Sequence, residues 1–83
     1  SSTQSRKILA QTLNIQGRLQ FTLGQTEPAL TTWKNAADIY KQIGDKTGAI
    51  RITINQSQAV QSLGNYNQAW RTLLENGKPL LTQ

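Results

Sequence analysis

The chain contains two copies of one short pattern, placed forty residues apart. Leu23-Gly24 is followed by Ala29, and Leu63-Gly64 is followed at the same distance by Ala69. A fixed period of this size is typical of repeat proteins, in which one pair of helices is used more than once and each pair packs on the next. We therefore predict an all-α fold of stacked antiparallel helical hairpins, and a function that depends on a binding surface.

Four helices are predicted from the spacing of the apolar residues. Gly24, Gly44 and Gly64 separate them, because glycine readily adopts the left-handed conformation that ends a helix. Gly77 and Pro79 are expected to end the last helix early, since proline lacks the amide donor that a helix needs. The single domain 1–83 then consists of repeat 1 at 5–43, with helices over about 5–23 and 27–43, and repeat 2 at 45–82, with helices over about 46–63 and 66–76.

Small and aromatic residues indicate how these helices pack. The large aromatic residues Trp33, Tyr40 and Trp70 fall on apolar stripes, so we predict that they belong to the core. Small residues fall where the two helices of a hairpin must approach closely, and these are Gly17, Ala29, Ser57 and Ala69.

The composition argues against catalysis and against a metal or cofactor site. The 83 residues include no cysteine and no histidine, and the four acidic residues are scattered along the chain. Histidine is the commonest general base and metal ligand at neutral pH, and cysteine is a frequent nucleophile. We predict a protein that is not an enzyme, with no catalytic residues, no metal ligands and no cofactor.

Nine basic residues against four acidic ones give a formal charge of +5, which favours acidic partners. The basic residues are dispersed, so a helical-repeat nucleic-acid binder is a less favoured interpretation. No apolar run approaches the length of a membrane span, and the first residues lack the apolar core of a signal peptide. We expect no membrane partner, and we expect the chain to be a piece of a larger protein. The cellular compartment is not decided by the sequence, with the cytoplasm slightly favoured.

The order of residue types resembles the tetratricopeptide repeat (TPR): a small residue, then Leu-Gly, then alanine, then a large apolar residue. The two copies are Gly17, Leu23-Gly24, Ala29 and Trp33, and Ser57, Leu63-Gly64, Ala69 and Leu73. The period is similar to the long, forty-residue variety of that family, and segments 14–20, 33–40 and 44–48 resemble arrays found upstream of caspase-like CHAT domains in bacterial proteins. The resemblance implies a TPR-like α-solenoid fragment with a non-catalytic role in protein–protein interaction.

The resemblance also implies a peptide-binding groove, lined by the first helix of each pair. The corresponding positions in this chain are Gln11, Asn14, Arg18, Phe21, Arg51, Asn55 and Gln58. Asn14 and Arg18 are one helical turn apart, as are Arg51 and Asn55, so each pair presents an amide beside a guanidinium. An amide can bind a peptide backbone and a guanidinium can bind a carboxylate, so we expect a protein or peptide partner, with acidic groups favoured.

Two other interpretations remain open at this point. The same amides and guanidiniums could instead connect neighbouring helices, with no ligand involved. The chain could also have a purely structural role, as a spacer or as a self-association module. In that homo-oligomer, Leu74, Leu80 and Leu81 would be buried against a second copy.

Overall fold

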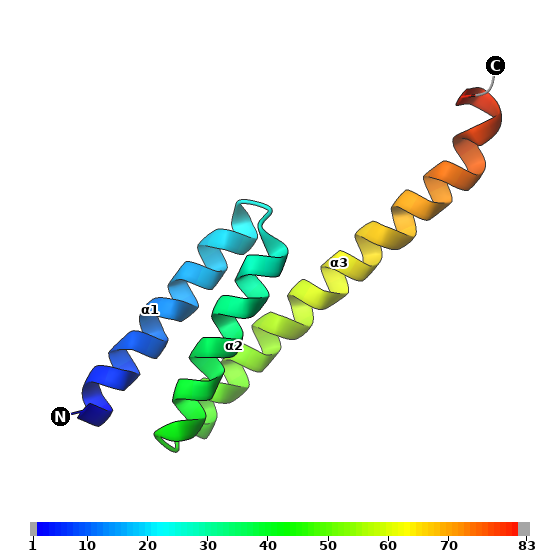
Figure 1. Cartoon of the computed structure of the whole chain (residues 1–83). Coiled ribbons are helices and arrows are strands. Elements are labelled where there is room, and N and C mark those ends of the chain that lie inside the picture. The colour runs from blue at the N-terminus through cyan, green and yellow to red at the C-terminus, as the bar shows by residue number, and fades with distance from the viewer. Residues whose placement is uncertain (1, 82–83) are drawn as a thin grey trace.

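The described part of the molecule consists of helices joined by short turns. A computed structural model describes the backbone of residues 2–81 and the side chains of residues 2–75. It contains α1 (Ser2–Thr22), α2 (Thr26–Gln42) and α3 (Lys46–Leu81), and no strand within the described backbone. Consecutive helices are antiparallel, and α2 packs against both α1 and α3 (Figure 1). The predicted all-α class is confirmed.

The two turns between helices have the same design. After α1, Gly24 has a φ of 82°, and the backbone N–H of Gln25 donates to the carbonyl of Gln20 at 2.8 Å. After α2, Gly44 has a φ of 77°, and the equivalent hydrogen bond is also 2.8 Å long. This is the Schellman arrangement, in which a residue in the left-handed conformation ends the helix. The backbone N–H groups of that residue and of the next one donate to carbonyls of the last helical turn. Both chain reversals thus occur at predicted glycines.

Two aromatic rings of α2 pack directly on glycine backbone in the neighbouring helices. A Cβ atom on Gly17 of α1 would overlap the indole of Trp33, and one on Gly48 of α3 would overlap the phenol ring of Tyr40. Trp33 is 2% exposed and Tyr40 is 6% exposed. The predicted core position of these two aromatic residues is therefore confirmed. The smaller side chains of the core are Ala10, Ala29, Ala36, Ala37, Ala49, Ile52 and Ala59.

The third helix differs from the prediction. α3 continues through Gly64 without a turn and passes Gly77 and Pro79 to end at Leu81. The four-helix prediction is therefore wrong, as are the helix break at Gly64 and the early end near residue 76. The second hairpin is not formed, and Trp70, predicted to lie in the core, is 52% exposed. The predicted burial of Leu80 and Leu81 concerns side chains outside the described residues.

The physical reason lies in the segment after each glycine. A glycine inside a helix costs only about 1 kcal/mol relative to alanine, so it permits a break without requiring one. The turns at Gly24 and Gly44 each bring together a large ring and a glycine surface. After Gly64, the position that corresponds to Trp33 is Leu73, and the position that corresponds to Gly17 is Ser57. If the chain turned back after Gly64, Leu73 would pack where Trp33 packs in the first hairpin, and the side chain of Ser57 would prevent the close approach that Gly17 allows.

The continuous α3 makes the molecule long. Its principal extents are 66 × 19 × 12 Å and its radius of gyration is 17.5 Å, whereas a compact domain of this length has a radius of gyration of about 12 Å. The second half of α3 projects beyond the α1–α2 turn (Figure 1). The α1–α2 pair therefore covers only the first half of α3.

The contact between Trp33 and Gly17 predicts an unusual response to alanine. Gly17→Ala should destabilise the protein by about 1–3 kcal/mol, although alanine is the better helix former, because the indole must move out of a close-packed site. Chemical denaturation followed by circular dichroism measures this change.

Gly64→Ala is the matched control, since a Cβ at Gly64 meets no atom within 4 Å. This substitution should stabilise the protein by about 0.5–1 kcal/mol. Destabilisation by Gly64→Ala would contradict a helical Gly64, and an unchanged or raised stability of Gly17→Ala would contradict the ring-on-glycine packing.

Candidate functional site

Most of the predicted groove residues line one concave surface between α1 and α3. Asn14 and Arg18 come from α1, and Arg51, Asn55 and Gln58 come from α3. Together with Ile54 they enclose a groove of about 410 Å³. This volume is within the range of known ligand sites, which is roughly 300–1,000 Å³. Five of the seven predicted residues are thus brought together, and we refer to this surface as the polar groove.

A hydrogen bond between two residues that line the polar groove joins α1 to α3. The side-chain amide of Asn55 donates from Nδ2 to Oδ1 of Asn14 at 3.1 Å, across 41 positions of sequence. Asn14 and Asn55 thus connect α1 to α3 directly. The bond uses one oxygen and one N–H, so the NH₂ group of Asn14 and the oxygen of Asn55 remain as neighbouring donor and acceptor. A peptide group presents the complementary acceptor and donor.

The two guanidinium groups give the polar groove its positive charge. The side chains of Arg18 and Arg51 are exposed, and among residues 2–75 no carboxylate forms an ion pair with either of them. The ion pair in this part of the chain joins Lys7 to Asp45, at 3.8 Å. Each arginine can therefore offer its planar fork of N–H donors to a carboxylate from outside the chain.

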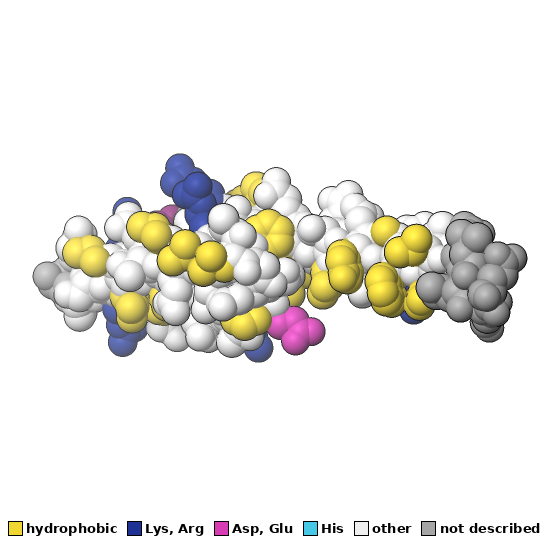
Figure 2. Space-filling model, turned by 90° about the horizontal axis from the view of Figure 1, so that it is seen from above, with side chains coloured by type: hydrophobic (Ala, Val, Ile, Leu, Met, Phe, Trp, Pro, Cys, Tyr) yellow, Lys and Arg dark blue, Asp and Glu magenta, His cyan; other side chains and the backbone are white. Residues whose placement is uncertain are grey.

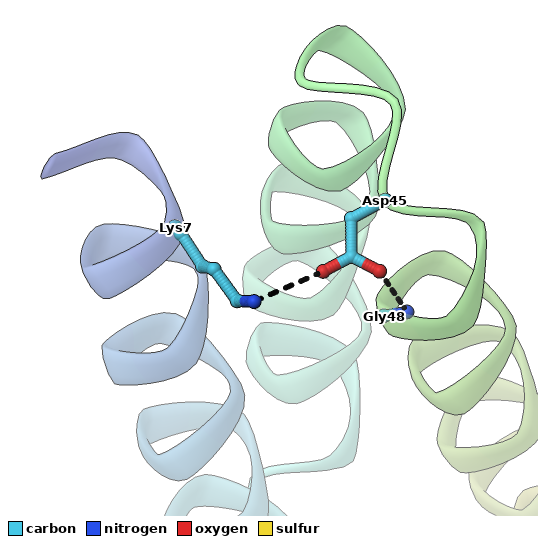
Figure 3. Close-up of polar contacts among 3 residues, drawn as sticks. All are labelled: Lys7, Asp45 and Gly48. Atoms are coloured by element: carbon cyan, nitrogen blue, oxygen red, sulfur yellow. Dashed lines mark hydrogen bonds and ion pairs between the residues drawn. The ribbon is translucent and has the colours of Figure 1, made fainter. Parts of the chain in front are cut away.

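A second, smaller hollow adjoins the polar groove at Arg51. It has a volume of about 240 Å³ and contains the predicted residue Gln11. Asp45 lies at its edge and links three segments, as Figure 3 shows: Oδ1 accepts from the backbone N–H of Gly48 at 2.9 Å, and Oδ2 faces Lys7. The first of these contacts is an N-cap, which satisfies a free amide of α3 and places negative charge at its positive end.

The hydroxyl-bearing ring of Tyr40 also borders this second hollow. Burial raises the pKa of its phenol above the ordinary value of 10.0, the nearby negative charge of Asp45 raises it further, and the positive charge of Arg51 partly opposes the change. Tyr40 therefore stays neutral throughout the physiological range and serves as a core residue.

Phe21, the seventh predicted residue, is not brought together with the others. Its ring is half-buried and packs against Trp33, with the two ring centroids 6.0 Å apart and the planes inclined by 53°. The structure places it at the edge of the core beside α2, where its contacts are with the hydrophobic cluster.

Lys7 is a residue of the second hollow that the sequence prediction omitted. It lines the second hollow with Gln11 and Arg51. A signal for it was present, because residues 7, 11, 14 and 18 follow one another at intervals of four, three and four, which is the spacing of a single helix face.

The described residues form neither a metal-binding cluster nor a membrane-spanning helix. Within the part of the chain that the structure describes, no three side chains of the His, Cys, Asp or Glu types come together in a metal-binding group. No helix among the described residues has both the length and the hydrophobicity that crossing a membrane requires.

Comparison with known proteins does not identify this chain. No protein-family model matches it, and no curated protein sequence or solved structure is significantly similar to it. The function must therefore be inferred from the geometry of the chain itself.

The raised pKa of Tyr40 predicts a loss of stability at high pH. The unfolded chain ionises this phenol near its ordinary pKa of 10.0 and the folded chain only at a higher pH. Its contribution is thus fully present below pH 10 and is lost as the pH rises through the folded pKa. Tyr40→Phe should flatten the decline in unfolding free energy above pH 10, measured by urea denaturation at a series of pH values.

Tyr66→Phe, measured at a concentration at which the chain is monomeric, provides the matched comparison, because the side chain of Tyr66 is then 68% exposed and its substitution removes the same hydroxyl group without touching the core. The Tyr66→Phe profile should follow that of the wild type. If both variants flatten the profile equally, the burial of Tyr40 is not the cause.

Proposed function

We propose that this chain is a non-catalytic, TPR-like protein-interaction module that binds an extended, carboxylate-bearing peptide in the polar groove. The observation that carries the proposal is the convergence of Asn14, Arg18, Arg51, Asn55 and Gln58, from two helices, on one concave surface. These residue types suit a peptide ligand, because they combine amides for the backbone with guanidiniums for an acid.

The proposed ligand would contact the groove in two ways. The free donor of Asn14 and the free acceptor of Asn55 would pair with one peptide group of the ligand, which fixes its register along the helices. Arg18 and Arg51 would then pair with a carboxylate, either from an acidic side chain or from the end of the peptide. Because both arginines are exposed, each ion pair is worth at most about 1 kcal/mol, and the binding should weaken as salt is added.

The test uses an array of short peptides that differ in the number of acidic residues and in whether the last residue carries a free carboxylate or an amide. The tightest binders are then measured in solution by fluorescence anisotropy. Arg18→Gln and Arg51→Gln should each weaken binding by about fivefold, which corresponds to the loss of one such ion pair.

Arg71→Gln is the matched control, since it removes the same charge from the projecting half of α3, away from the polar groove. It should leave binding almost unchanged. Equal losses in all three variants would show attraction by net charge alone, and equal binding of acidic and neutral peptides would contradict carboxylate recognition. Single-stranded RNA serves as a competitor, and its preferential binding would contradict a peptide ligand.

A further inference from the structure

The apolar stripe by which α3 packs on α2 continues beyond the end of α2. Ile52 and Ala59 are fully buried in this stripe. After Ala59 the same face carries, at intervals of four, three, four and three residues, Leu63, Tyr66, Trp70 and Leu73. Alternation of four and three keeps residues on one face of a helix, as in the seam of a coiled coil. The face that binds α2 is thus extended, in phase, by about three turns of helix without a partner.

We call Leu63, Tyr66, Trp70, Leu73 and the adjacent Leu74 the projecting stripe. Four of these residues are strongly exposed: Tyr66 by 68%, Leu73 by 61%, Trp70 by 52% and Leu74 by 44%. In the view of Figure 2, hydrophobic side chains follow the projecting part of α3 towards the grey atoms at its end. Contiguous apolar surface of this kind usually marks an interaction site, and single exposed apolar residues do not.

The charges around the projecting stripe indicate what kind of partner it fits. Residues 60–75 contain one basic and one acidic residue, Arg71 and Glu75, which are one helical turn apart and give this segment no net charge. Neither occupies a position of the stripe. The excess of +5 therefore lies elsewhere in the chain, so an acidic partner would find no excess of positive charge here. Two copies of the segment, in contrast, could meet without repulsion between like charges.

The position of α2 decides the orientation of such a pair. The α1–α2 turn meets α3 at the base of the stripe and forms a notch of about 470 Å³ with Ser62, Leu63 and Tyr66. In a parallel pair both α1–α2 hairpins would need the same space. An antiparallel pair places them at opposite ends of the contact.

We propose that a second copy of this chain covers the projecting stripe, through antiparallel packing of two α3 helices around a two-fold axis near Trp70. The interface is isologous: Tyr66 of each copy faces Leu74 of the other copy across the axis. Burial of the stripe from both copies removes on the order of 1,000 Å² of apolar surface, which is the scale of a specific protein–protein contact. This inference does not depend on the polar groove.

The experiment is sedimentation velocity of the full chain over about a hundredfold range of concentration, combined with acrylamide quenching of tryptophan fluorescence. Trp33 is buried and Trp70 is exposed, so quenching reports mainly on Trp70. We expect a monomer–dimer equilibrium in which Trp70 becomes protected as the dimer forms. Trp70→Gln and Leu73→Gln should each weaken dimerisation at least about tenfold. Ile15→Gln, at a residue of α1 that is 65% exposed, should dimerise like the wild type.

Circular dichroism of each variant at low concentration shows whether the monomer keeps its helices, which is expected because the substituted side chains are exposed. A wild type that stays monomeric at every concentration, with Trp70 equally accessible throughout, would overturn the proposal. A dimer that persists in both glutamine variants would also overturn it, because another face would then be responsible.

Discussion

The packing of Trp33 and Tyr40 over glycine backbone holds the three helices together. Each ring lies where a neighbouring helix has no side chain, so α2 can approach α1 at Gly17 and α3 at Gly48 more closely than larger residues would allow. The indole N–H of Trp33 also donates to the carbonyl of Asn14 at 3.3 Å, which satisfies the polar atom of a buried ring. Most other core residues are alanines, so these two rings provide much of the buried apolar area.

The polar groove depends on the same packing. With α2 held on both neighbours, the exposed faces of α1 and α3 lie side by side closely enough for Asn14 and Asn55 to form a hydrogen bond. The arginines one turn away from each amide then line the same surface. The projecting stripe depends on the opposite situation, because no ring-on-glycine contact draws the second half of α3 back onto its first half. One molecule thus carries a polar surface at its three-helix end and an apolar surface on a single helix.

The sequence was sufficient to predict the helical class, the turns at Gly24 and Gly44, and most of the polar groove. These features depend on local signals: the spacing of apolar residues, the left-handed preference of glycine, and residues one turn apart on a helix face. It was insufficient for Gly64, because a leucine-glycine pair looks the same whether or not the next segment has a ring to bury. Phe21 was misplaced for a related reason, since its helix position lies at the border between the groove and the core, and contact with Trp33 decides between them.

Gly64 stays helical because the segment after it lacks the ring-on-glycine contact that closes the first two turns. The decisive measurement is backbone NMR, with Cα chemical shifts and amide-to-amide nuclear Overhauser effects recorded over residues 60–70. We expect an unbroken series of helical shifts and sequential contacts through Gly64, and the shifts of left-handed residues at Gly24 and Gly44. Left-handed shifts at Gly64, together with contacts between residues 66–75 and residues 50–60 of the same chain, would mean that the chain turns back at Gly64 and that this explanation is wrong.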